Sequence, residues 1–176
     1  MELQNPIPVY AGSDGKAVPN REISTVFYTI IQNWINNGPV KNDRLETMLQ
    51  ALDENNMPIF QRLLNDFVVN TLSYYDTSGR DPEKVYQAFL LGMLVSNGAY
   101  EISSNREAGL GRYDILMRPR DLSKRGIIME LKLFDPLYDE SVEETLSSAL
   151  RQIEDKQYTA SLHAVGITNV LEMAIT

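Results

Sequence analysis

Two short apolar runs near the middle of the chain carry acidic and basic side chains whose spacing could support phosphodiester chemistry. Asp114 lies in the first run, at 112–118, and Glu130 and Lys132 lie in the second, at 126–134. Side chains alternate between the two faces of a strand, so Glu130 and Lys132 are expected on the same face. Antiparallel pairing of the two strands would bring Asp114 beside Glu130. The spacing therefore predicts a site where two carboxylates and an ammonium group meet.

The same alternation predicts how the two faces of these strands are used. In the first run, Tyr113 and Ile115 are expected on one face and Asp114 on the other. In the second run, Met129 is expected on the face opposite Glu130. One face of the sheet is therefore expected to belong to the core, and the other is expected to carry the chemistry.

These residue types suit a divalent cation and a phosphate. Magnesium prefers oxygen ligands at roughly 2.0–2.1 Å and is usually held by one or two carboxylates, with water and substrate phosphate in its other positions. Asp114 and Glu130 would supply the carboxylates. Lys132, about 6.6 Å along the strand from Glu130, could orient a water or balance charge in the transition state. The pattern predicts a phosphodiesterase that uses Mg²⁺, with Mn²⁺ able to substitute.

The order of these residues resembles that of a known superfamily. Asp114, followed by Glu-Leu-Lys at 130–132 and by the helical stretch QIEDKQY at 152–158, resembles the PD-(D/E)XK nucleases. The run SNREAGLGRYD at 104–114 is similar to the nuclease-like domain found C-terminal to an AAA-type ATPase in many bacterial proteins. This resemblance extends from about Pro82 to the C-terminus, and it implies an AAA-type ATPase partner, in cis or in trans.

The resemblance also implies a role for each matching position. Asp114 and Glu130 would bind the metal through their carboxylates, Leu131 would bind it through its backbone carbonyl, and Lys132 would be the catalytic lysine. Gln152 would be a further catalytic residue and would line the substrate side of the site from its helix. Residues expected to support the ligands from nearby are Glu83, Glu107 and Tyr158. Residues expected to contact nucleic acid are Arg106, Arg112 and Lys156. The proline that names the superfamily is replaced by Tyr113.

The composition excludes several kinds of site. Cysteine is absent, which excludes disulfides and thiolate zinc sites, and a single histidine, His163, excludes a histidine-rich metal centre. The chain shows neither a basic apolar leader nor a run approaching the roughly 20 apolar residues of a membrane span. A cytoplasmic protein without a membrane partner is expected. The net charge of −8 argues against a general nucleic-acid binder, although a locally basic strip lies between Arg106 and Lys132. An ordinary solvated strand edge would explain that strip equally well.

Capping signals and periodicity divide the chain into three parts. Residues 1–19 are expected to form an extended arm, and 20–80 are expected to form a helical subdomain that docks the ATPase. Its helices are predicted from Asn20 to about Asn37, from Asp43 as a capping residue, and from Pro58 to Tyr74. The remainder, 81–176, is expected to form the nuclease-like core.

Within 81–176 the predicted order is a helix, three strands, a helix and a strand. The strands are expected at about 99–105, 112–118, 126–134 and 170–176. A capping box of Ser141 and Glu144 predicts a long helix that turns Leu150 and Ile153 inward and ends near Gly166. This order predicts an α/β, restriction-endonuclease-like fold, a mixed sheet flanked by helices, with an N-terminal helical extension. The superfamily pattern continues with one more strand, so the core is expected to be either truncated at its C-terminus or naturally short.

Three functions remain open on the sequence alone. The favoured one is a Mg²⁺-dependent nuclease that hydrolyses DNA, or with less support RNA, by metal-activated water. The first alternative is a catalytically silent nuclease-like module that docks to the ATPase or binds nucleic acid. The second is a purely structural docking domain, which the helical extension and the net acidity would suit.

Overall fold

The computed structural model describes residues 42–72, 82–134 and 141–176. The predicted arm at 1–19, the first predicted helix and Tyr74 lie outside the described residues. The elements, in chain order, are α2 (Asn42–Asp53), α3 (Met57–Thr71), α5 (Pro82–Leu94), β1 (Tyr100–Ser104), β2 (Glu107–Ala108), β3 (Gly111–Arg112), β4 (Ile115–Pro119), β5 (Gly126–Leu131), α6 (Val142–Asp155), α7 (Ala160–His163) and β6 (Val170–Ile175).

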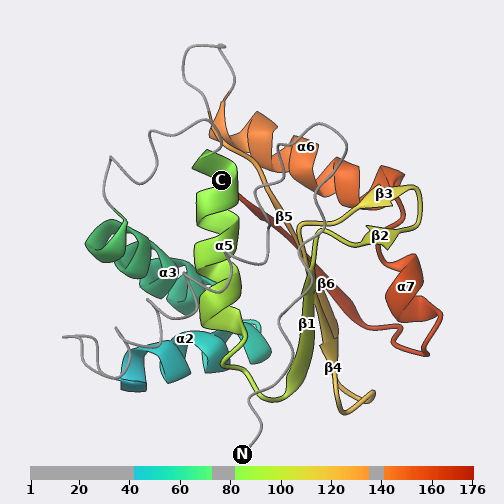
Figure 1. Cartoon of the computed structure of the whole chain (residues 1–176), viewed down its shortest axis with the longest axis horizontal. Helices are drawn as coiled ribbons and strands as arrows, with labels where there is room; N and C mark the ends of the chain where they lie inside the picture. Colours follow the sequence, from blue (N-terminus) through green and yellow to red (C-terminus); the bar gives the residue numbers. More distant parts are fainter. Residues whose placement is uncertain (1–41, 73–81, 135–140) are drawn as a thin grey trace, which may run out of the picture.

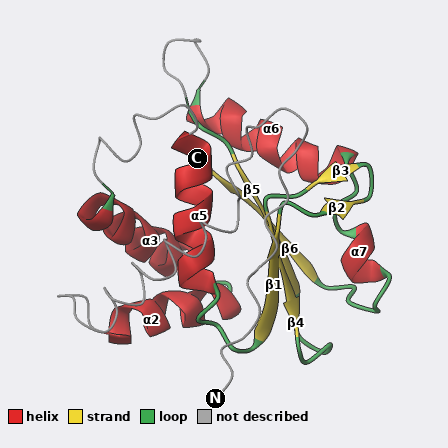
Figure 2. Ribbon diagram, in the orientation of Figure 1, coloured by secondary structure: helices red, strands yellow, loops and turns green. Residues whose placement is uncertain are grey.

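A four-stranded mixed sheet organises the fold. Its strand order is β1-β4-β5-β6, with antiparallel pairing of β1 to β4 and of β4 to β5 and parallel pairing of β5 to β6. The helices α2, α3 and α5 lie on one side of the sheet, and α6 and α7 lie on the other (Figure 1). The two short strands β2 and β3 form a separate hairpin (Figure 2). The predicted α/β fold with a mixed sheet flanked by helices, consistent with a restriction-endonuclease-like architecture, is confirmed.

Both faces of the sheet are buried, which corrects the prediction of one core face and one chemical face. Ile127 and Met129 point into an apolar cluster with α2, α3 and α5. Ile128, on the opposite face, is fully buried in a second cluster with Ile153 of α6. Glu130 shares that second face and is only 2% exposed. The acid of β5 is therefore buried between the sheet and α6, not displayed on an open face.

The two N-terminal helices that the structure describes are part of the main apolar cluster. Met48 and Leu52 of α2 and Phe60 of α3 are almost fully buried in the same cluster as Ile115 and Ile127 of the sheet. Burying apolar surface contributes roughly 25 cal/mol per Å² removed from water. Contacts from α2 and α3 therefore stabilise the sheet that carries Asp114 and Glu130.

Helix boundaries follow the local signals at some positions and depart from them at others. The capping box that begins α6 is present, with Glu144 N–H donating to Ser141 Oγ at 3.1 Å and Ser141 N–H donating to Glu144 Oε2 at 2.8 Å. The predicted cap at Asp43 is wrong, because α2 already includes Asn42 and places Asp43 in its first turn. None of the described helices is long and apolar enough to cross a membrane.

The C-terminal half of α6 also differs from the prediction. The helix ends at Asp155, well before Gly166, because Gln157 adopts a φ of 53° and the short helix α7 follows. Ile153 is buried as predicted, but Leu150 is 41% exposed. The side of α6 that meets the sheet is instead formed by Thr145, Ala149 and Ile153.

Candidate active site

Asp114 lies in a bend immediately before β4. The antiparallel register of β4 and β5 places Ile115 opposite Met129. One step further along both strands, the same register sets Asp114 opposite Glu130. The structure thus brings the two acids together, although the strand begins at 115 and not at 112 as predicted.

The bend before β4 changes the direction of Tyr113. Its ring is buried with Leu116 and Ile128 on the α6 side of the sheet, and not with Ile115 on the opposite side. The N–H of Asn105, a residue with a φ of 52°, donates to the carbonyl of Tyr113 at 3.1 Å across this bend. The face predicted for Tyr113 is therefore wrong, because alternation holds only within a regular strand.

Hydrogen bonds from two neighbouring elements fix Asp114. Its carboxylate Oδ2 accepts from the backbone N–H of Leu131 at 2.8 Å. Gln87 of α5 donates through Nε2 to the Asp114 carbonyl oxygen at 2.9 Å and approaches Oδ1 at 3.5 Å. Sequence reasoning missed Gln87, which is buried. Its position one helical turn after Glu83 is the signal that could have found it, since residues four apart share one side of a helix.

Glu130 is joined to Lys132 through Gln152 of α6. The Gln152 amide Nε2 donates to Glu130 Oε1, and the Gln152 carbonyl oxygen accepts from Lys132 Nζ at 2.6 Å. Lys132 Nζ also forms an ion pair with Glu130 Oε1 at 3.5 Å. Gln152 Nε2 further donates to the Tyr158 hydroxyl at 3.2 Å. One amide therefore holds the acid, the lysine and the tyrosine in a single network.

The electrostatics of this site disfavour two ionised acids. Burial and then the charge of Asp114 raise the pKa of Glu130 from 4.5 to about 7. Burial also raises the pKa of Asp114, and the carboxylate of Glu83 raises it further. The charge of Glu83 of α5 likewise raises the pKa of Glu130. The charge of Lys132 lowers the pKa of both acids, but both pKa values remain above their ordinary range.

A divalent cation would fit this arrangement of donors. Glu130 Oε2 is buried and has no hydrogen-bond partner among the described residues, a state that costs free energy unless a cation or donor satisfies the oxygen. The described residues contain no cluster of three or more ligating side chains. Magnesium does not require one, because one or two carboxylates with water and phosphate are its usual set. Asp114 and Glu130 are the carboxylates that would hold it.

Comparison with known protein families matches residues 81–176 to the PD-(D/E)XK nuclease superfamily, which is more than half of the chain. The chain belongs to this superfamily. No curated protein and no solved structure matches it. Membership suggests a nuclease-like function, and it covers Asp114, Glu130, Lys132 and Gln152 together. The association with an AAA-type ATPase is not part of this match.

The β2–β3 hairpin contacts the end of α6 (Figure 2). The N–H of Leu110 donates to the carbonyl of Lys156 at 2.8 Å. The rings of Tyr113 and Tyr158 meet edge to face, with centroids 6.3 Å apart. Tyr113 also shares a hydrogen bond of 2.8 Å with the hydroxyl of Ser103. These contacts fix Tyr158, which in turn bonds to Gln152.

Replacing Gly109 by alanine is expected to destabilise the protein by roughly 2 kcal/mol or more. Gly109 has a φ of 55°, and an added Cβ would overlap the backbone carbonyls of Lys156 and Gln157. Chemical denaturation of the variant measures the loss. Gly98→Ala is the matched control, because its Cβ would meet nothing within 4 Å. Equal midpoints for the two variants would contradict a close approach at Gly109.

Four of the residues predicted to surround the metal ligands are exposed, namely Arg106, Glu107, Arg112 and Lys156. Glu107 lies on the hairpin and pairs with Arg112 at 3.4 Å, and both side chains are largely exposed. Unlike Glu83, Glu107 is not among the charges that shift the pKa of Asp114 or Glu130. Arg106 and Lys156 are also exposed, and the Lys156 stem passes beside Gly111 of the hairpin.

The predicted basic strip is interrupted. Arg118, at the opposite end of β4 from Asp114, pairs with Glu101. Arg125 donates to the backbone carbonyl of Asp53 at 2.7 Å and so links the β5 end of the sheet to α2. The exposed basic side chains Arg106, Arg112 and Lys156 lie instead at or beside the hairpin and the end of α6, which meet each other.

Proposed function

We propose that this chain is a nuclease domain that hydrolyses phosphodiester bonds of nucleic acid with Mg²⁺, for which Mn²⁺ can substitute. The observation that carries the proposal is the buried Glu130, which has an unsatisfied oxygen, lies beside Asp114 and is joined by Gln152 to Lys132. The charge of Glu83 also raises the pKa of Glu130, so the negative charge around this acid favours a bound cation.

Each residue has a role that follows from its place. The carboxylates of Asp114 and Glu130 would hold the cation, which when bound supplies an activated water and stabilises charge on the phosphate. The N–H of Leu131 donates to the Asp114 carboxylate. Because the N–H and C=O of one strand residue point to the same side, the Leu131 carbonyl also points toward Asp114 and is a further candidate ligand. Lys132 is held by Gln152 next to the acids, where its ammonium group would orient water and balance charge on the transition state.

Substrate would approach from the side of the hairpin. Arg106, Arg112 and Lys156 are exposed there and would contact backbone phosphates. We propose DNA as the substrate in preference to RNA. An acidic chain with few phosphate contacts would gain from a partner that raises the local concentration of substrate, and the SNREAGLGRYD run at 104–114 supports an AAA-type ATPase in this role.

Cleavage of end-labelled single-stranded and duplex DNA with Mg²⁺ or Mn²⁺, with EDTA as the control, tests the proposal. Binding of the same DNA is expected to be weak and to fall steeply between 50 and 200 mM salt, because the few phosphate contacts release counterions and the net charge of −8 repels phosphate. Tight binding that is independent of salt would contradict this expectation. Metal binding without cleavage of any substrate would favour the silent module.

The affinity for Mn²⁺ is expected to depend on pH. Glu130 must lose its proton to bind a cation, and its pKa is about 7. Affinity should therefore rise by up to about tenfold per pH unit below 7 and level off above it. Calorimetry between pH 5.5 and 8.5, in buffers with different ionisation enthalpies, measures both the affinity and the proton release. A flat profile without proton release would show that Glu130 does not ligate the metal.

A further inference from the structure

Asp114 accepts hydrogen bonds at its backbone carbonyl as well as at its carboxylate. Gln87 Nε2 of α5 donates to the carbonyl oxygen at 2.9 Å, and the backbone N–H of Asn105 donates to the same oxygen at 3.3 Å. The two donors belong to different segments, since one lies on a helix and the other directly follows β1. Asp114 itself lies in a bend before the register of β4 and β5 begins. The two donors therefore fix a residue that regular strand pairing does not hold.

The side chains of Gln87 and Asn105 are also joined to each other. Asn105 Nδ2 donates to Gln87 Oε1 at 3.4 Å. A side-chain amide has one donor end and one acceptor end, so this bond directs the Gln87 oxygen toward Asn105 and the Gln87 nitrogen toward Asp114. A reversed amide would set its oxygen against the carbonyl oxygen of Asp114. The orientation of the Gln87 amide is therefore determined by two partners.

The carboxylate of Asp114 is left with one oxygen that is only weakly engaged. Oδ2 accepts from the backbone N–H of Leu131 at 2.8 Å. Oδ1 lies 3.5 Å from Gln87 Nε2, which is long for a hydrogen bond. An ionised carboxylate has about four lone-pair sites on its two oxygens. Oδ1 therefore keeps the capacity to bind a cation, while Gln87 keeps the main chain of Asp114 where Leu131 can hold Oδ2.

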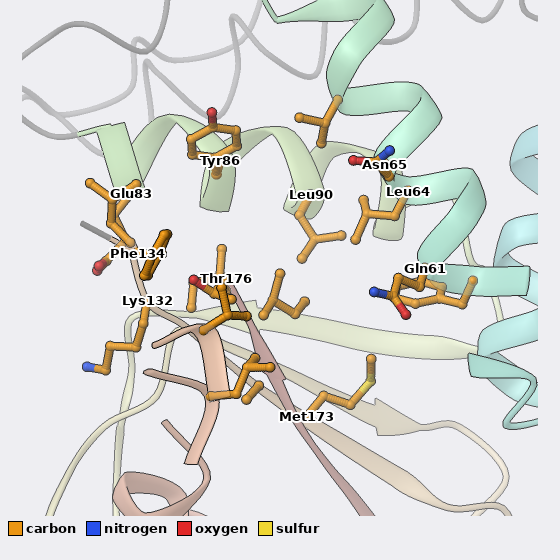
Figure 3. A pocket seen from close by; sticks show the side chains of 18 of the residues that line it. Gln61, Leu64, Asn65, Glu83, Tyr86, Leu90, Lys132, Phe134, Met173 and Thr176 are labelled. Atoms are coloured by element: carbon orange, nitrogen blue, oxygen red, sulfur yellow. The ribbon is translucent and has the colours of Figure 1, made fainter. Parts of the chain in front are cut away.

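The packing of α5 does not require this amide. Apolar side chains of the helix, Phe89 and Met93 among them, are buried in the main apolar cluster. Glu83 of the same helix lines a cavity of about 770 Å³ together with Lys132 (Figure 3). Gln87 is not among the residues that line this cavity, and it is the one buried polar residue of α5. Apolar burial contributes most of the packing energy, so the bonds of Gln87 point to a role at Asp114.

We propose that Gln87 is a positioning residue that holds Asp114 in the orientation in which Oδ2 accepts from Leu131 and Oδ1 stays available. This inference rests on the proposed function, in which Asp114 binds the cation. Residues that hydrogen-bond to a metal ligand fix its direction, and their loss typically lowers metal affinity by about 10–100-fold. Gln87 has the contacts that this role needs, and it acts through Asp114 without being a ligand itself.

Replacing Gln87 by methionine tests this role in the full chain. Methionine is unbranched and fills a similar space but has no N–H, so it keeps the packing and loses the bonds to Asp114. Calorimetry at pH 8 should show Mn²⁺ binding about 10–100-fold weaker than in the wild type. The rate of DNA cleavage at saturating Mn²⁺ should stay within about threefold, because Glu130, Lys132 and Gln152 are unchanged. A purely structural residue would lower stability without this split between affinity and rate.

The metal-free protein provides a second readout. NMR hydrogen exchange reports on the Leu131 amide, whose acceptor is Asp114 Oδ2. This amide should exchange at least about tenfold faster in Gln87→Met, because a less ordered Asp114 protects it less. The next amide along the chain is an internal control. The N–H of Lys132 donates to the carbonyl of Ile175 at 2.9 Å, and its exchange should not change.

Two further variants complete the set. Asn97→Ala removes another buried amide, which donates to Asp53 Oδ1 at 3.1 Å near the other end of β1 from Asp114. It should lower the melting temperature and leave both the Mn²⁺ affinity and the Leu131 exchange unchanged. Asn105→Gly keeps the left-handed backbone and its N–H but removes the donor to Gln87. It should weaken Mn²⁺ binding roughly threefold, because Asn105 is exposed and water can replace part of the lost bond.

The outcomes separate this inference from the proposed function. Wild-type Mn²⁺ affinity in a folded Gln87→Met variant would overturn the inference, as would an unchanged exchange rate of the Leu131 amide. If thermal melts show that Gln87→Met is unfolded, Asn105→Gly decides, and wild-type affinity in that variant would overturn the inference. A wild type that binds no Mn²⁺ would reject the proposed function. Faster Leu131 exchange in Gln87→Met would in that case still show that Gln87 positions Asp114.

Discussion

Lys132→Ala is expected to lower the rate of phosphodiester cleavage by about 10²–10³-fold while the affinity for Mn²⁺ at pH 8 changes by no more than about threefold. The reason lies in the geometry of its ammonium group. Lys132 Nζ is held 2.6 Å from the Gln152 carbonyl oxygen and 3.5 Å from Glu130 Oε1, beside the proposed ligands but not among them. Its contribution is therefore expected in the transition state, where charge develops on the phosphate.

Single-turnover cleavage and calorimetry, both at pH 8, separate the two effects. The high pH matters because Lys132 lowers the pKa of Glu130, so its loss would weaken metal binding near neutral pH through protonation alone. Lys124→Ala is the control, since this lysine is exposed in the turn before β5 and its charge acts on Asp53. Cleavage by Lys132→Ala at the wild-type rate would reduce this lysine to a structural partner of Gln152.

Alternation and capping predicted much of the site because they are local properties. Strand periodicity and antiparallel pairing are enough to place Asp114 opposite Glu130, and the Ser141 capping box is enough to begin α6. The bend at Tyr113 could not be predicted in this way. It depends on Asn105, a residue in a different segment, whose N–H bonds to the carbonyl of Tyr113.

The residues that sequence reasoning missed or misplaced depend on tertiary packing. Gln87 looks like an ordinary polar residue of α5 until the helix packs against the sheet and brings it to Asp114. Leu150 fits an inward stripe by spacing, yet the buried stripe is offset by one residue and includes Ala149. Small residues allow α6 to approach the sheet closely. A search for large apolar residues at helical spacing does not detect such small residues.

The sequence predicts that the N-terminal helices dock an AAA-type ATPase, and a test of this prediction must leave the apolar core intact. Met48, Leu52 and Phe60 are buried in the same cluster as the sheet. Deleting α2 and α3 would therefore expose apolar surface and remove contacts that support Asp114 and Glu130, so loss of ATPase binding by a truncated chain would not identify a docking face. Substitution of exposed residues such as Val69, which is 68% exposed, keeps the core intact and tests docking directly.

Glu130→Gln is expected to abolish measurable Mn²⁺ binding and, in metal-free buffer at pH 8, to raise the free energy of unfolding by roughly 1–3 kcal/mol. The pKa of Glu130 is about 7 in the folded protein, above its ordinary value of 4.5. The folded state therefore holds this proton more tightly than the unfolded state. Stability falls as pH rises from about 4.5 to 7, and above 7 the full cost of the buried charge is present. A neutral amide carries no such cost and keeps an oxygen to accept from Gln152.

The sign of this effect distinguishes a metal site from a structural ion pair. Urea denaturation at pH 5 and pH 8 should show the variant more stable than the wild type at pH 8, with the difference shrinking toward pH 5. Added Mn²⁺ should reverse the order at pH 8, because a ligand that binds only the folded state stabilises the wild type and not the variant. If Glu130 served mainly to pair with Lys132, the substitution would instead destabilise the metal-free protein at pH 8. A variant less stable than the wild type in EDTA would thus reject the metal-ligand role on stability alone, without any assay of cleavage.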